Sequence, residues 1–244
     1  MLETRALHAG YGPFEVLHGI SLEVPDRTIV ALLGHNGAGK TTLLKTIAGQ
    51  LPATSGEMAY QGRPIVRRDP GAVSRMGIRY VPQDQNVFPN MTLRDNLLAG
   101  AYAANLAPAA FEQQLAVVYA LFPALAEREH LYARVLSGGQ RQMLAISMAL
   151  MTAPKMLLLD EPSAGLSPSN VQRLFDSFTA MRDELGTSVL LVEQNVNEAL
   201  RVAANAYVMQ EGRIVFFAPA AERDQIIAHL WGLATPCHGE RSEA

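Results

Sequence analysis

A glycine-rich segment near the N-terminus has the residue types and spacing of a phosphate-binding loop. Its eight residues, Gly34-His-Asn-Gly-Ala-Gly-Lys40-Thr41, fit the pattern G-x-x-x-x-G-K-[ST]. The glycines allow a tight backbone turn whose successive N–H groups point at phosphate oxygens, and a helix that begins near Lys40 adds the positive end of its dipole. We predict that Lys40 neutralises the β- and γ-phosphates of a nucleotide and that the Thr41 hydroxyl binds Mg²⁺.

Two adjacent carboxylates follow an apolar segment in the second half of the chain. Residues Met156–Leu159 are apolar throughout and lead directly into Asp160 and Glu161. The carboxyl end of such a strand is where an α/β sheet binds its ligands. We predict that Asp160 belongs to the Mg²⁺ shell and that Glu161 is the general base that polarises the attacking water. Alone, two acids would serve a structural or helix-capping role equally well; the phosphate loop upstream favours catalysis.

The elements that must position these residues alternate between strands and helices. Helical spacing follows Lys40 and again follows Ser167-Pro168, where a serine N-cap and a first-turn proline begin a helix that Gly186 ends. This alternation indicates the α/β class, and the apolar strands suggest a largely parallel sheet buried on both faces. The predicted strands are Ile20–Val24, Thr28–Leu33, Gly77–Val81, Met156–Asp160, Ser188–Val192 and Ala206–Met209.

The stretch from Asp84 to Ala153 has a different character. It is rich in Ala, Leu and Gln, shows no clear strand pattern, and contains Thr92-Leu-Arg-Asp95, which resembles the capping box of a helix. We predict an α-helical subdomain inserted between two parts of an α/β core. The predicted division is 1–83 for the first part of the core, 84–153 for the helical subdomain, 154–233 for the second part of the core and 234–244 for a flexible tail.

Composition and charge exclude several classes of protein. The 244 residues are 49% hydrophobic and 18% charged, as in a globular protein with a sizeable core, and the net charge of -3 gives no support to a nucleic-acid partner. The single cysteine, Cys237, cannot form an internal disulfide, which favours a reducing compartment. Neither a signal peptide nor a membrane-spanning run is apparent, so any membrane role is expected to come through a partner.

A glycine-containing pentapeptide between the phosphate loop and the acidic pair carries a family resemblance. In Leu136-Ser-Gly-Gly-Gln140, Ser137 and Gln140 have the spacing of a capping box, and the glycines expose N–H groups at a helix start, which is a second phosphate site. A simple capped helix would account for the segment alone. In its position in this chain it resembles the signature of ATP-binding-cassette (ABC) ATPases, in which it closes on the nucleotide of the other subunit. The resemblance extends from about Leu2 to Pro219.

The resemblance implies a fold and a set of ligands. The implied fold is a P-loop NTPase core of the RecA-like kind, with a mostly parallel sheet, an antiparallel β portion and an inserted α-helical subdomain. Tyr11 matches the aromatic residue that stacks on adenine, and Gln83 matches the glutamine that links Mg²⁺ to the helical subdomain; a turn tyrosine and a surface glutamine are the alternatives. The implied metal ligands are Thr41, Gln83 and Asp160. The implied ATP contacts are Tyr11, Asn36, Gly37, Ala38, Gly39, Lys40, Thr41, Thr42, Gln83, Ser137, Gly138, Gly139 and Gln140.

Two positions depart from the family pattern. An acidic residue is usual where Ser167 ends the expected dimer-contact loop, Ser163–Ser167, so one contact is expected to be missing. Gln194 replaces the histidine that contacts the γ-phosphate. An amide still donates a hydrogen bond to phosphate but carries no positive charge, so we expect weaker or pH-independent stabilisation there. We predict that Gln194 acts with Lys40 and Glu161 in catalysis; a residue that only caps the strand is the alternative.

Three segments narrow the resemblance within the family. Val192–Asn195, Glu161–Pro168 and Gln142–Ile146 are similar to the ATPase subunits of branched-chain amino acid importers. The implied partners are a second ABC ATPase, identical or different, two transmembrane permeases and, indirectly, a periplasmic solute-binding protein. The implied location is the cytoplasmic face of the inner membrane, as a peripheral subunit.

Other functions compete with amino acid import. Close relatives of these importers handle urea, short amides or other small solutes, and the same motor would serve an exporter. A non-transport cassette acting on ribosomes or DNA is disfavoured by the single cassette, the absence of a heptad array and the net charge. A P-loop kinase or GTPase would share the phosphate loop but not the Leu136–Gln140 signature.

Overall fold

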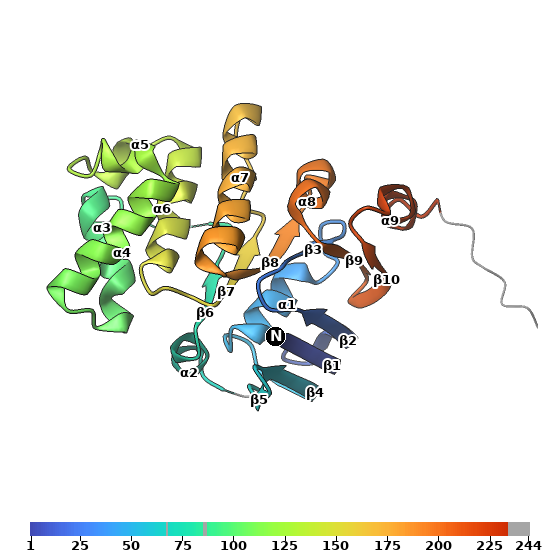
Figure 1. The fold of residues 1–244 in the computed structure, drawn as a ribbon. Coiled ribbons are helices and arrows are strands. Elements are labelled where there is room, and N and C mark those ends of the chain that lie inside the picture. The colour runs from blue at the N-terminus through green and yellow to red at the C-terminus, as the bar shows by residue number, and fades with distance from the viewer. Residues whose placement is uncertain (67, 85–86, 234–244) are drawn as a thin grey trace, which may run out of the picture.

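The computed structural model describes residues 1–66, 68–84 and 87–233 (Figure 1). The predicted tail, 234–244, lies outside the described residues, and so does Cys237. Within the described ranges, no helix combines the length and the apolar character needed to cross a bilayer.

A six-stranded sheet in the order β10-β9-β3-β8-β7-β6 forms the centre of the fold. The five strands from β9 to β6 pair in parallel, and β10 joins β9 antiparallel. Every residue of β3, β7 and β8 is buried, which explains their unbroken apolar sequences. The five predicted strands of this sheet are confirmed within one residue at each end, whereas β10 was not predicted. The bounds are β3 (Ile29–Leu33), β6 (Ile78–Val81), β7 (Met156–Asp160), β8 (Ser188–Glu193), β9 (Asn205–Gln210) and β10 (Arg213–Pro219).

A second, antiparallel sheet has the order β2-β1-β4-β5. The sequence predicted only Ile20–Val24 of it as a strand. The other strands lack a clean alternation, because β4 exposes four consecutive residues and β1 contains register shifts around Ala6, whose φ is 43°. The bounds are β1 (Leu2–Tyr11), β2 (Phe14–Val24), β4 (Ala53–Tyr60) and β5 (Arg63–Pro64).

The six-stranded sheet separates two hydrophobic cores. Successive residues of β3 point to opposite faces, so Ala31 enters one core while Val30 and Leu32 enter the other. Helices cover the first face, and α1 with the antiparallel sheet covers the second (Figure 1). The helices next to the sheet are α1 (Lys40–Ile47), α2 (Pro70–Arg75), α7 (Pro168–Leu185), α8 (Val196–Val202) and α9 (Arg223–Leu230).

The segment between β6 and β7 forms a group of helices at one side of the molecule (Figure 1). Its described residues contain no strand, as predicted, and the Thr92 hydroxyl accepts a hydrogen bond of 3.1 Å from Asp95 N at the start of α3. The α/β fold with an antiparallel portion and a helical insertion is therefore as expected, while the bounds of the division stay a prediction. The helices are α3 (Leu93–Ala101), η1 (Tyr102–Ala104), α4 (Pro108–Leu121), α5 (Pro123–Ala126), η2 (Ala133–Val135) and α6 (Gly138–Leu150).

Helix α7 begins and ends where the sequence predicts, but its N-cap makes no capping bond. Gly186 ends it in the left-handed conformation, with a φ of 66°. Ser167 occupies the N-cap position, yet its hydroxyl pairs with the Ser169 hydroxyl at 3.4 Å and accepts no hydrogen bond from a backbone N–H of the first turn. The sequence therefore predicted the N-cap position correctly, but the capping hydrogen bond expected of a serine there is not formed.

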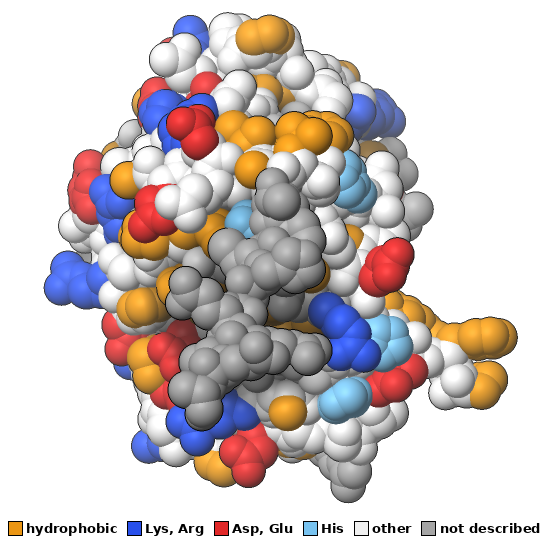
Figure 2. Space-filling model, turned by 90° about the vertical axis from the view of Figure 1, so that its right-hand side faces the viewer, with side chains coloured by type: hydrophobic (Ala, Val, Ile, Leu, Met, Phe, Trp, Pro, Cys, Tyr) orange, Lys and Arg blue, Asp and Glu red, His pale blue; other side chains and the backbone are white. Residues whose placement is uncertain are grey.

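Charges of both signs are mixed on the face that Figure 2 shows. Outside the grey region, Lys and Arg side chains alternate with Asp and Glu side chains and with apolar ones. The described residues visible in Figure 2 form no broad surface of positive charge, which is the surface typical of nucleic-acid binding.

Candidate active site

Three neighbouring parallel strands end at the candidate active site. The loops that follow β3, β7 and β8 carry the phosphate-loop residues, Glu161 and Gln194. The carboxyl ends of parallel strands share one edge of a sheet, so these loops lie together. The turn after β3 requires glycine at Gly34, because a Cβ there would lie 2.3 Å from the carbonyl oxygen of Met209. Gly39, with a φ of 103°, turns the chain into α1.

The ammonium group of Lys40 is buried inside the phosphate loop. Its Nζ donates hydrogen bonds to the carbonyl oxygens of Gly34 (2.7 Å) and His35 (3.0 Å) and lies 3.7 Å from Glu161 Oε1. Burial lowers the pKa of Lys40, and the nearby Glu161 carboxylate opposes that shift. A cavity of about 370 Å³ adjoins it, whose lining includes Asn36, Gly39, Lys40, Thr41, Thr42 and Gln83. This loop therefore presents a fixed positive charge and backbone donors to an anionic ligand.

Asp160 is a buried carboxylate held by two hydroxyl groups. Thr41 Oγ1 donates to Asp160 Oδ1 at 3.1 Å, and the Tyr80 hydroxyl donates to Oδ2 at 3.0 Å. Burial raises the pKa of Asp160 although both hydrogen bonds favour its charged form. The pKa of Tyr80 is also raised, first by burial and then by the Asp160 charge. Two predicted metal ligands, Thr41 and Asp160, are thus in direct contact.

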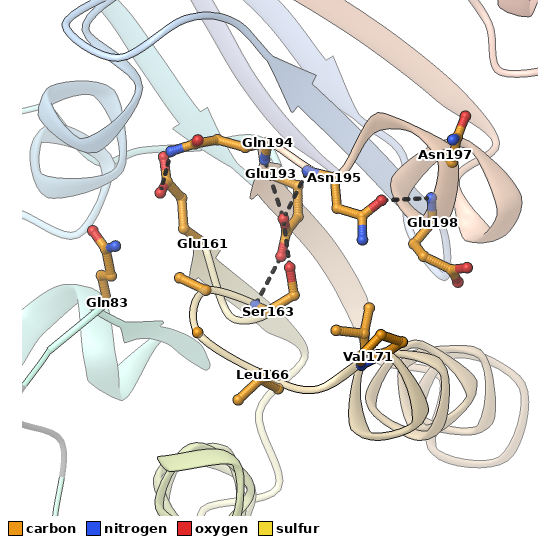
Figure 3. A pocket seen from close by; sticks show the side chains of 13 residues that line it. Gln83, Glu161, Ser163, Leu166, Val171, Glu193, Gln194, Asn195, Asn197 and Glu198 are labelled. Carbon is orange, nitrogen blue, oxygen red and sulfur yellow. Dashed lines mark hydrogen bonds between the residues drawn. The ribbon is translucent and has the colours of Figure 1, made fainter.

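Glu161, Gln194 and Asn36 meet through one amide group. Gln194 Nε2 donates to Glu161 Oε2 at 2.6 Å (Figure 3) and also to Asn36 Oδ1 at 2.8 Å. Glu161 has a φ of 47°, a conformation uncommon outside glycine that often marks functional positions. The structure therefore joins all three predicted catalytic residues, because Glu161 contacts Gln194 on one side and Lys40 on the other.

The Leu136–Gln140 segment forms the predicted capping box at the start of α6. Gln140 N donates to the Ser137 hydroxyl at 3.3 Å, and Ser137 N donates to Gln140 Oε1 at 3.1 Å. Gly139 is buried, and a Cβ there would lie 3.2 Å from Leu166 of the 163–167 loop, whereas Gly138 is exposed with open space around it. Among the described residues that line the cavity beside Lys40, none comes from this segment.

A known family combines a phosphate loop, an acidic pair at the end of a strand and a capping box like that of Leu136–Gln140. Residues 17–164 match the family model described as ABC transporter. The chain belongs to the ABC transporter family. This membership confirms the predicted resemblance. It also confirms the prediction that the chain is an ATP-binding subunit that hydrolyses ATP to drive transport.

Individual ABC proteins are similar over most of the chain. The high-affinity branched-chain amino acid transport ATP-binding protein BraG of Pseudomonas aeruginosa is 43% identical over 88% of this chain and 91% of its own length. The probable branched-chain amino acid transport ATP-binding protein LivF of Archaeoglobus fulgidus is 39% identical over 91% and 93%. A crystal structure of a nucleotide-free ATP-binding cassette from an ABC transporter has a TM-score of 0.84 at 26% identity and covers 95% of both chains. The predicted fold class is confirmed.

Two of the expected ABC contacts lie at the edge of the site. Gln83 is exposed and lines the cavity that Thr41 and Glu161 also line. Tyr11 ends β1 at the tip of the β1–β2 hairpin with 47% of its surface exposed, and Val16 of the same hairpin lines the cavity. Adenine stacking by Tyr11 and metal binding by Gln83 stay predictions.

Two residues of this ABC site were missed by the sequence analysis. Tyr80 lies in the predicted strand β6, but only the pairing of β6 with β7 brings its hydroxyl to Asp160. Glu193 ends β8 as a buried carboxylate that binds Ser163. A charged residue at the end of an otherwise apolar strand was the available signal for Glu193, whereas nothing local distinguishes Tyr80.

Proposed function

We propose that this ABC ATPase energises the import of branched-chain amino acids. The observation that carries the proposal is its 43% identity, over 88% of the chain, to an ATP-binding protein of branched-chain amino acid transport. A second relative with a similar name, 39% identical, comes from an archaeon. Similarity of this extent in both proteins supports a shared class of solute, although the cassette itself does not contact the solute.

In the proposed reaction, Glu161 is the general base for water attack on the γ-phosphate of ATP. The hydrogen bond from Gln194 holds the Glu161 carboxylate, and Lys40 lies beside it as the charge that neutralises phosphate. The Gln194 NH₂ group donates both of its hydrogens, to Glu161 and to Asn36, so a hydrogen bond to the γ-phosphate would replace one of these two. The residues around the cavity beside Lys40, together with Tyr11, would hold the rest of the nucleotide.

The residues around Asp160 fit a magnesium ion. The Thr41 hydroxyl and the Asp160 carboxylate are adjacent oxygen ligands, and Gln83, whose side chain carries an amide oxygen, lines the cavity that Thr41 lines. Mg²⁺ takes oxygen ligands, needs only one or two carboxylates from the protein, and binds phosphate oxygens as well. When bound, Mg²⁺ would neutralise charge that develops on the phosphates. Thr41, Asp160 and Gln83 would hold it.

The proposed assembly contains several subunits. Cassettes of this family dimerise and pair with permeases. Here we propose a second ABC ATPase, identical or different, two transmembrane permeases and, indirectly, a periplasmic solute-binding protein, with this chain peripheral on the cytoplasmic face of the inner membrane. The Ser137–Gln140 segment would close on ATP held by the second cassette, and the helical segment 84–153 would move against the cores 1–83 and 154–233.

The transport assignment is tested by purification of the tagged chain from gently solubilised membranes. We expect two polytopic permeases, a second cassette and a periplasmic binding protein to accompany it. Titration of that binding protein should show affinity for leucine, isoleucine and valine above that for urea or short amides. A preference for urea or amides would show that the proposed solute class is wrong. Recovery of ribosomal proteins or DNA alone would overturn the transport function.

Replacement of Glu161 by glutamine tests the catalytic role. Glu161→Gln removes the base but keeps the shape, so the kcat of ATP hydrolysis should fall by about 100-fold or more, while ATP affinity stays close to that of the wild type. Glu184→Gln, an exposed change on α7, is the control and should keep full turnover. Normal turnover in Glu161→Gln would contradict the assignment.

A further inference from the structure

A buried carboxylate behind the catalytic residues connects two loops. Glu193 is only 2% exposed and accepts four hydrogen bonds (Figure 3). Ser163 N donates to Oε1 at 2.9 Å, and the Ser163 hydroxyl donates to Oε2 at 2.9 Å. The backbone N–H groups of Gln194 and Asn195 donate to the same Oε2 at 3.1 and 3.2 Å. One side chain therefore fastens the start of the 163–167 loop to the start of the loop after β8.

The charge of this carboxylate is not part of any ion pair among the described residues, and Lys40 interacts with it only from a longer distance. In the described part of the chain, no Lys, Arg or His forms an ion pair with Glu193. Burial raises the pKa of Glu193 although all the donors favour its charged form. A buried, unpaired carboxylate is costly for stability, so a strand end that needed only a cap would be better served by a neutral side chain.

The connected loops both lead to the catalytic base. Glu161 lies two residues before Ser163, and its N–H donates to the carbonyl oxygen of Val192 at 2.9 Å. Gln194 directly follows Glu193, and its side chain donates to Glu161 Oε2 at 2.6 Å. Chain connections and hydrogen bonds thus form a closed ring from Glu161 through Ser163, Glu193 and Gln194 back to Glu161.

The 163–167 loop is also in contact with the signature helix and with open space. Leu166 packs against Gly139 at the start of α6, and the loop lines a cavity of about 690 Å³ together with Glu193, Gln194 and Glu198. A displacement of this loop has room to occur, and Ser163 would transmit it to the Glu193 carboxylate.

From this ring we propose that Glu193 is a positioning residue that couples the 163–167 loop to the Gln194–Glu161 pair. Contact between this loop and the second cassette then sets the position of the Gln194 amide at the base, so hydrolysis depends on how the two cassettes meet. The inference rests on the proposed function, because it requires that Glu161 be the base. A purely structural Glu193 would affect folding without affecting the hydrolytic step.

Glu193→Gln is the sharpest variant for this coupling. Whichever way its amide is turned, the NH₂ group faces a backbone N–H, from Ser163 at one position or from Gln194 and Asn195 at the other, and a donor cannot bind a donor. We expect the kcat of the purified transporter complex to fall about 10- to 100-fold, as small misplacements of catalytic groups do, while the KM for ATP changes less than about twofold.

Ser163→Ala provides a second, milder variant that removes only the hydroxyl bond. It should lower kcat less, and the double variant should lose no more than Glu193→Gln alone, because both changes break one connection. Glu198→Gln neutralises a carboxylate on the same cavity, and Ser177→Ala removes a buried hydroxyl that bonds within α7; both controls should keep the wild-type kcat.

The outcomes separate the coupling from the function on which it rests. A kcat unchanged in Glu193→Gln or, where that variant fails to fold, in Ser163→Ala would overturn the coupling, and so would a rise in KM equal to the loss in kcat. Normal turnover in Glu161→Gln would instead overturn the role of Glu161 in the proposed function on which the coupling rests. The coupling is supported if kcat falls in Glu193→Gln while KM stays nearly constant, and if the double variant loses no more kcat than Glu193→Gln alone.

Discussion

Two hydroxyl groups hold the Asp160 carboxylate, one at each oxygen. Thr41 and Tyr80 each donate to one oxygen, and no Lys, Arg or His of the described residues forms an ion pair with this side chain. Burial keeps the pKa of Asp160 raised, and a bound cation would offset that cost by favouring the charged form. Tyr80 thus acts on the proposed metal site through Asp160 and not as a ligand.

Tyr80→Phe should weaken the response to magnesium. Loss of a hydrogen bond that orients a ligand typically reduces metal affinity 10- to 100-fold, so the Mg²⁺ concentration for half-maximal ATP hydrolysis should rise about tenfold. ATP binding measured without Mg²⁺ should be unchanged. Tyr119→Phe is a matched control, because its hydroxyl donates to Glu129 in the helical segment, away from the site. An equal effect in both variants would exclude a specific role for Tyr80.

At the scale of elements, two serine N-caps of the same type differ in what their side chains do. The Ser137 hydroxyl accepts a bond from Gln140 N at the start of α6, whereas the Ser167 hydroxyl caps nothing at the start of α7. Ser137→Ala should therefore lower the free energy of unfolding by about 1 kcal/mol. Ser167→Ala, at an exposed position, should change it by less than about 0.5 kcal/mol. Urea unfolding of the nucleotide-free chain measures both, and similar losses would contradict the observed caps.

At the scale of the whole molecule, none of the described residues that line the cavity beside Lys40 comes from the signature helix α6. Gly138 has open space around it, and an acidic residue in the first turn of a helix is favourable, so Gly138→Asp should keep the stability of the isolated chain. In the assembled transporter its charge would oppose the phosphates of the second cassette's ATP, so ATP turnover should fall about tenfold or more. Unchanged turnover would show that this helix start meets no nucleotide.

Local chemistry made much of the site predictable from the sequence. The phosphate loop, the acidic pair after Met156–Leu159 and the Ser137–Gln140 capping box are each contained in a few consecutive residues, so their types and spacing suffice. The strands of the parallel sheet were found because burial on both faces leaves apolar runs. Most of the antiparallel sheet was missed, since its half-exposed strands carry bulges and no clean alternation.

Contacts between distant segments were decided by the tertiary structure alone. The order of the strands places β6 beside β7 and so brings the Tyr80 hydroxyl to Asp160, 80 residues away. Pairing of β7 with β8 likewise brings Ser163 to Glu193 and Glu161 to Gln194. The sequence by itself determined the family, the nucleotide chemistry and the residues on each loop. Which of those residues touch depends on strand order and register, which arise from packing the whole chain and leave no local pattern.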